Sequence, residues 1–62
     1  MIYFISRRNK YGEERFLKIG SNKHTWVENM ADATEFMDFH TMMVRLNRFT
    51  TNKDYMYSFH GF

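Results

Sequence analysis

The chain has 62 residues and a formal net charge of +2, and it contains seven Phe, four Tyr, one Trp, six Met and no Cys. This length allows a single domain, residues 1–62, and a chain of this size buries only about 60% of the surface that its unfolded form exposes. The absence of cysteine excludes disulfides and thiolate zinc sites. The aromatic and Met side chains can build a core, but so short a chain cannot bury them all, which predicts an exposed contact surface.

Hydropathy and charge limit the location and the partners. No apolar run approaches the roughly 20 residues of a membrane-spanning helix, and no basic segment precedes the apolar stretch at residues 1–5 as it would in a signal peptide. We therefore expect a cytoplasmic protein without a membrane partner. Residues 1–24 carry six basic and two acidic side chains, whereas residues 25–38 carry four acidic and no basic ones. Such segmentation steers encounters with partners more than it stabilises a fold.

The segment from Ile2 to Ile19 predicts a β-hairpin. Residues 2–6 and 15–19 are rich in strand formers, and the turn residues between them are Asn9-Lys10-Tyr11-Gly12. A loop of these residues places Arg8 opposite Glu13 and Arg7 opposite Glu14, which pairs opposite charges. The face expected to form the core then carries Ile2, Phe4, Leu17 and Ile19. The other face carries Tyr3, Ile5, Phe16 and Lys18.

The remainder of the chain predicts helix followed by strand. Met30, Ala33 and Met37 have helical spacing, so a short helix is expected near residues 29–37. A second apolar stripe, with Asp38 as its N-cap, predicts a helix from Phe39 to Phe49. Alternation from residue 55 to residue 60 predicts a final strand. The expected fold is α+β: a small β-β-α-β domain with a three-stranded antiparallel sheet and helix packed on one face.

The sequence offers no pattern typical of catalysis or metal binding. His24, His40 and His60 are far apart and form no HExxH-type spacing. No serine lies in a nucleophile-elbow context. Glu13 and Glu14 are neighbours in a strand, so their side chains point to opposite faces. We therefore expect no enzymatic activity, no metal and no cofactor.

The residues expected to contact a partner combine aromatic side chains on the second sheet face with nearby basic ones. They are Tyr3, Ile5, Phe16, Lys18, Tyr55, Tyr57, Arg7, Arg8 and Lys10. Tyr, Phe and Arg are enriched at the cores of protein interfaces, so the expected partner is another protein. A homodimer that covers this patch is one alternative. Nucleic acid bound by the basic hairpin is another, less favoured because the acidic segment repels phosphate.

The order of the apolar positions resembles a group of small accessory proteins encoded by bacteriophages. The resemblance covers residues 3 to 46 and is carried by Phe16-Leu17-Lys18-Ile19-Gly20, Trp26, Ala33-Thr34-Glu35-Phe36 and the helix that follows. In that group, an Ala-x-x-Phe turn pins the helix to the sheet. The resemblance implies a protein of the bacterial host cytoplasm that binds a host protein, such as a defence or transcription factor, and inhibits or redirects it. All matched positions are structural, so no functional residue is carried over.

Overall fold

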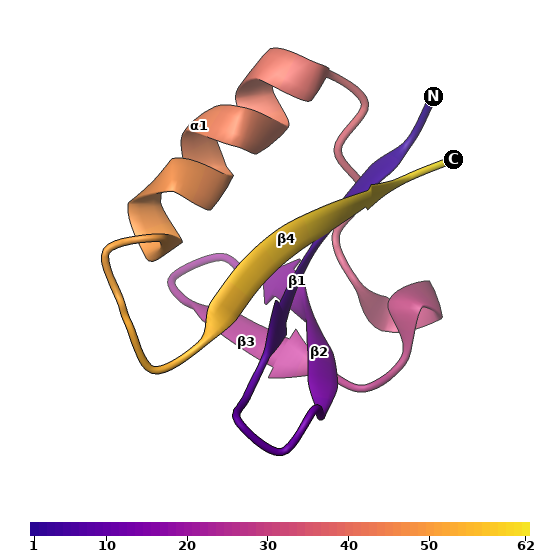
Figure 1. The fold of residues 1–62 in the computed structure, drawn as a ribbon. Coiled ribbons are helices and arrows are strands. Elements are labelled where there is room, and N and C mark those ends of the chain that lie inside the picture. The colour runs from indigo at the N-terminus through magenta and orange to yellow at the C-terminus, as the bar shows by residue number, and fades with distance from the viewer.

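The computed structural model describes residues 1–62 and contains one antiparallel sheet with an α-helix across it (Figure 1). The elements in chain order are β1 (Tyr3–Arg8), β2 (Glu14–Ile19), β3 (His24–Val27), the 3-10 helix η1 (Met30–Asp32), α1 (Phe39–Phe49) and β4 (Met56–Gly61). The strand order is β3-β2-β1-β4. The termini lie side by side because Ile2 and Phe62 exchange two backbone hydrogen bonds of 2.8 Å. The predicted α+β class is confirmed.

The helix predicted from the apolar stripe is present as α1, with the expected bounds. It begins after Asp38, whose Oδ2 accepts hydrogen bonds from the Thr41 backbone N–H at 2.8 Å and from the Thr41 hydroxyl at 3.0 Å. Met42 and Leu46 are its buried residues. No helix in the structure combines the length and the hydropathy needed to cross a bilayer.

The sheet has four strands, so the prediction of three was wrong. The additional strand is β3, which forms a tight hairpin with β2, closed by the Gly20 N–H bonded to the Lys23 carbonyl at 2.7 Å. Thr25, Trp26 and Val27 are types that favour a strand. The helix expected near residues 29–37 is also absent, apart from the single turn η1.

Residues 33–36 are extended because they fill the gap where β1 and β2 diverge. The Thr34 N–H bonds the Leu17 carbonyl at 3.0 Å, and the Thr34 hydroxyl accepts from the Ile19 N–H at 2.7 Å. Phe36 forms a bridge with Tyr3 and is buried. Tertiary hydrogen bonds to two strands therefore replace the helical bonds that the local periodicity favoured.

The predicted hairpin register was wrong by one residue, because the loop contains three residues and not four. The Asn9 N–H bonds the Glu13 carbonyl, and the left-handed residue that closes the loop is Gly12, with φ of 85°. The Asn9 side chain also accepts hydrogen bonds from the N–H groups of Tyr11 and Glu13. In the resulting register Arg7 faces Arg15 and Arg8 faces Glu14.

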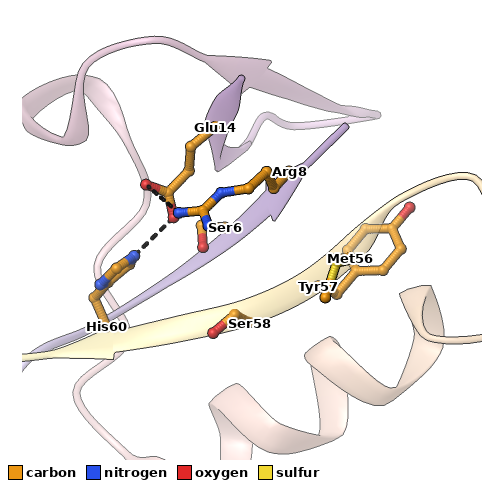
Figure 2. A pocket seen from close by; sticks show the side chains of 7 residues that line it. All are labelled: Ser6, Arg8, Glu14, Met56, Tyr57, Ser58 and His60. Atoms are coloured by element: carbon orange, nitrogen blue, oxygen red, sulfur yellow. Dashed lines mark hydrogen bonds and ion pairs between the residues drawn. The ribbon is translucent and has the colours of Figure 1, made fainter. Parts of the chain in front are cut away.

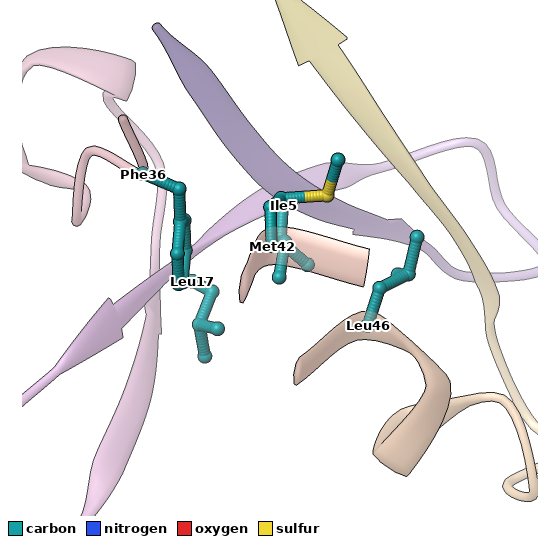
Figure 3. Close-up of a cluster of buried hydrophobic side chains, with 5 residues drawn as sticks. All are labelled: Ile5, Leu17, Phe36, Met42 and Leu46. Carbon is teal, nitrogen blue, oxygen red and sulfur yellow. The ribbon is translucent and has the colours of Figure 1, made fainter. Parts of the chain in front are cut away.

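This shift exchanges the two faces of β1 and leaves those of β2 as predicted. Ile5 is fully buried on the helix side, and Phe4, expected in the core, lies on the opposite side. The buried apolar cluster in Figure 3 joins the sheet to the helix and consists of Ile5, Leu17, Phe36, Met42 and Leu46.

Candidate functional site

One face of the sheet has no helix packed on it, and we call it the uncovered face. Side chains alternate between the two faces along each strand, and α1 packs against the face that carries Ile5 and Leu17. The strand registers assign the following residues to the uncovered face: Phe4, Ser6, Arg8, Glu14, Phe16, Lys18, Thr25, Val27, Met56, Ser58 and His60.

Several apolar side chains lie on the uncovered face beside its polar residues. Met56 is 76% exposed, and Phe62, which continues the alternation of β4, is 67% exposed. The Phe62 ring lies edge-on to the Phe4 ring with 6.1 Å between centroids. Phe16 on β2 lies 5.9 Å from the His60 ring. Exposed and half-buried apolar groups therefore surround the centre of this face.

The centre of the uncovered face is a shallow polar pocket of about 340 Å³. Figure 2 shows the residues that line it, which are Ser6, Arg8, Glu14, Met56, Tyr57, Ser58 and His60. Three strands contribute to it, because β1 lies between β2 and β4 in the sheet. Ser6 forms its floor and is only 1% exposed.

Glu14 contacts two other charged or titratable side chains of this pocket. Its Oε2 lies 2.8 Å from the Nε2 of His60, and its Oε1 lies 3.9 Å from a guanidinium nitrogen of Arg8. The hydrogen bond from His60 lowers the pKa of the Glu14 carboxyl, and a hydrogen bond from the Ser6 hydroxyl and the Arg8 charge act in the same direction. Partial burial opposes these effects without cancelling them.

The pocket has serine, glutamate and histidine but not the order that nucleophilic catalysis requires. A serine nucleophile needs the base next to its hydroxyl and the carboxylate behind the base. Here Glu14 lies between Ser6 and His60, and the Ser6 side chain is shielded from solvent. The structure also has no group of three or more His, Cys, Asp or Glu side chains that could hold a metal ion. The contacts of Glu14 with His60 and Arg8 link β2 to β4 and β1 electrostatically.

The predicted contact residues divide between several places. Phe16, Lys18 and Arg8 lie on the uncovered face, and Lys10 lies in the hairpin loop. Ile5 is fully buried on the helix side, so its predicted place on the open face of the sheet is wrong. Four predicted contact residues lie on the helix side or its margin: Tyr3, Arg7, Tyr55 and Tyr57.

Most of this second group is engaged within the fold. The Arg7 guanidinium carbon lies 4.0 Å from the Tyr55 ring centroid and 4.5 Å from that of Trp26. Tyr57 stacks on Phe49 at 5.7 Å. The predicted single patch is therefore not formed by these residues. Tyr57 joins β4 to α1 through Phe49, and Arg7 joins Tyr55 to Trp26 of β3.

Tyr3 belongs to an exposed group of rings at the rim of the sheet. Its ring centroid lies 5.4 Å from that of Phe39 and 6.2 Å from that of Phe59, and the two Phe rings are 5.6 Å apart. Phe39 is 48% exposed and Phe59 is 37% exposed. We call Tyr3, Phe39 and Phe59 the rim rings. They lie where the start of α1 meets the edge strand β4 (Figure 1).

Sequence reasoning missed Phe4, Met56 and His60 as members of the uncovered face. The correct hairpin register would have placed Phe4 there, and Asn9 followed by Gly12 was the signal for the shorter loop. No local signal pairs His60 with Glu14, because the two residues are 46 positions apart in the chain.

Comparison of the chain with protein-family models, curated protein sequences and solved structures finds no match. The resemblance to bacteriophage accessory proteins stays a prediction.

Proposed function

We propose that this chain is a non-enzymatic module that binds another protein through the uncovered face. The observation that carries the proposal is a sheet face without a packed helix, on which Phe4, Phe16 and Met56 remain accessible to differing degrees. An exposed apolar patch with polar neighbours is typical of protein contact sites. Phe, Met and Arg are enriched at the cores of such sites.

The polar centre gives such a surface its specificity. A partner that covers the pocket must satisfy or avoid the charges of Arg8 and the paired Glu14 and His60. Lys18 adds an exposed positive charge next to Phe16. The favoured partner surface is apolar with acidic groups at its margin. On the resemblance described above, the partner would be a bacterial host protein of defence or transcription, bound in the cytoplasm and inhibited or redirected.

Site-specific photocrosslinking tests this proposal. A benzophenone amino acid replaces Phe16 in one sample, and in a matched control it replaces Val44, which is 45% exposed on the helix. Both proteins are mixed with bacterial lysate and irradiated, and the adducts are identified by mass spectrometry. We expect a defined protein adduct from position 16 that is absent from position 44.

The adduct must also respond to the chemistry of the face. Lys18→Glu reverses one charge beside the probe and should reduce the yield of the adduct. Lys53→Glu makes the same change in the loop before β4 and should leave it unchanged. Equal adducts from positions 16 and 44, or a yield that neither variant alters, would contradict the proposal.

Single-stranded nucleic acid is the second candidate partner. Phe4 and Phe16 are rings on adjacent central strands, and Arg8 and Lys18 flank them on the same face, as in sheets that stack bases. Glu14 at the centre disfavours phosphate, which is why this candidate ranks second. Affinity for a labelled oligonucleotide should fall steeply with salt if phosphates are bound. Protein binding through apolar contacts should change little over the same range.

A further inference from the structure

The free edge of β4 is unusually unprotected. No Asp, Glu, Lys or Arg occurs from Tyr55 to Phe62, the one histidine there, His60, is paired with Glu14 on the uncovered face, and there is no proline in the chain. Proteins normally protect an edge strand with charges, proline, bulges or a short length, because its unpaired backbone groups attract other strands. β4 has six residues and none of these devices. Met56 and Phe59 are exposed beside the edge.

The hydrogen bonds define which backbone groups face outward. Ile2 and Phe62 each donate a backbone N–H to the carbonyl of the other, so they form a hydrogen-bonded pair. Such pairs alternate along an antiparallel ladder, and therefore Met56, Ser58 and His60 of β4 are the residues that bond to β1. The intervening residues Tyr57, Phe59 and Gly61 therefore direct their N–H and C=O groups away from the sheet. No other segment of the chain bonds to these groups.

The opposite edge of the sheet differs. β3 has only four residues and is followed directly by Glu28 and preceded directly by Lys23. A short strand with a charge at each end is a protected edge. The edge at β3 is therefore protected against pairing with another strand, whereas the edge at β4 is open to it.

We infer that β4 pairs with β4 of a second copy of this chain, antiparallel and about a twofold axis, so that two sheets become one continuous sheet. The outward residues must face one another for their bonds to form. Placing Ser58 opposite Ser58 of the partner subunit satisfies this condition for every outward residue of the strand. A twofold contact of this kind is the commonest form of homo-oligomer.

The side chains fit this register. Tyr57 faces the partner subunit's Phe59 on the helix side, and cross-strand aromatic pairs stabilise antiparallel sheets. Tyr55 faces the partner subunit's Gly61, where the partner subunit's Tyr3 ring lies 3.2 Å from the position that a Cβ atom would take, so the two tyrosine rings meet there. No charged residues oppose one another within the strand. The rim rings of each subunit then lie next to the new strand pair, and the two uncovered faces form one larger surface.

A cysteine at position 58 tests the register directly, because the chain has no cysteine of its own. Ser58 is in a non-hydrogen-bonded pair in this arrangement, where Cα atoms lie about 4.5 Å apart, within the range of about 4.4–6.8 Å for disulfides. Ser58→Cys should form a disulfide-linked dimer quickly under mild oxidation. Thr25→Cys, which is also exposed but lies on β3, should form it slowly.

Sedimentation of the unmodified protein gives the second measurement. We expect a monomer–dimer equilibrium over micromolar to near-millimolar concentrations, and a monomer for Phe59→Pro, which removes an outward N–H but no bond to β1. Circular dichroism shows whether Phe59→Pro is folded. If Phe59→Pro is unfolded, the comparison of crosslinking at positions 58 and 25 decides the question. A wild-type monomer at all concentrations, or equal crosslinking at positions 25 and 58, would overturn the inference. Both measurements use purified protein alone, so they fail or succeed independently of partner binding at Phe16.

Discussion

The His60 Nε2 lies 2.8 Å from the Glu14 Oε2, so a single contact joins β4 to β2 across the intervening strand β1. Ser6 of β1 is buried in the same pocket. The side chains that form this tie come from the beginning and the end of the chain. They place polar groups at the centre of the uncovered face, and apolar side chains lie around them, including Phe16, which pairs with Ser6.

This contact predicts a specific dependence of stability on pH. Because the pKa of Glu14 is lowered in the folded state from its ordinary value of 4.5, mainly by the hydrogen bond from His60, the unfolded chain binds the proton more readily. The stabilisation by Glu14 is therefore complete above pH 4.5 and is lost as the pH falls through the lower folded-state pKa. Urea unfolding at a series of pH values measures it.

Replacing the histidine provides the control. In His60→Ala the carboxyl loses its main hydrogen-bond donor, so the pKa of Glu14, followed by NMR of its carboxyl carbon, should rise toward the ordinary value. An unchanged pKa in this variant would show that the contact does not form in solution.

Neighbouring residues of β1 test the hairpin register. Ile5 is fully buried, and its replacement by Ala should lower the free energy of unfolding by about 2–5 kcal/mol. Phe4→Ala should cost less, although the side chain removed is larger, because the ring is only partly buried on the uncovered face. Thermal or urea unfolding measures both. The reverse order of stability would restore the register in which Phe4 is in the core.

Arg7 and Arg8 are adjacent in β1, but their side chains have different surroundings. Arg7 lies over the rings of Trp26 and Tyr55, so Arg7→Ala should destabilise the fold by about 1–2 kcal/mol. Arg8, whose side chain is 56% exposed and 3.9 Å from Glu14, should cost less than about 1 kcal/mol when replaced by Ala. Urea unfolding followed by the fluorescence of Trp26 measures both changes. Equal effects would argue against the cation–π contacts.

The start of α1 depends on a side-chain cap. Asp38→Ala removes the acceptor of two hydrogen bonds from Thr41, so we expect a lower melting temperature and less helical signal in circular dichroism. Asp38→Asn keeps an acceptor at the same position and should retain most of both. If Asp38→Ala and Asp38→Asn behave alike, the capping bonds contribute little.

The local sequence predicted features that depend on neighbouring residues. The apolar stripe and Asp38 were sufficient to predict α1, because its hydrogen bonds and its cap lie within the segment itself. The first hairpin was recognised for the same reason. The final strand was recognised from the alternation of its side chains, although its hydrogen bonds go to β1 at the other end of the chain. The hairpin register was missed because the Asn9 side chain satisfies two N–H groups of the loop and Gly12 closes it one residue earlier.

The candidate site was predicted only in part. Phe16 and Lys18 lie on the uncovered face as expected, because β2 was assigned to the correct faces. Arg8 of β1 also lies there, but only because the two faces of β1 are exchanged relative to the prediction. Ile5 was placed on the wrong side, since a shift of one residue exchanges the faces of a strand. The helix expected near residues 29–37 failed for another reason. Thr34 and Phe36 take their hydrogen bonds from strands distant in the chain.

The sequence by itself determined the first hairpin, α1 and the final strand as segments, and that this short chain has more aromatic side chains than it can bury. Only the tertiary structure decided that β4 lies at an unprotected edge and that His60 meets Glu14. Both depend on contacts between residues far apart in the chain, and the local periodicity of side chains contains no information about such pairs.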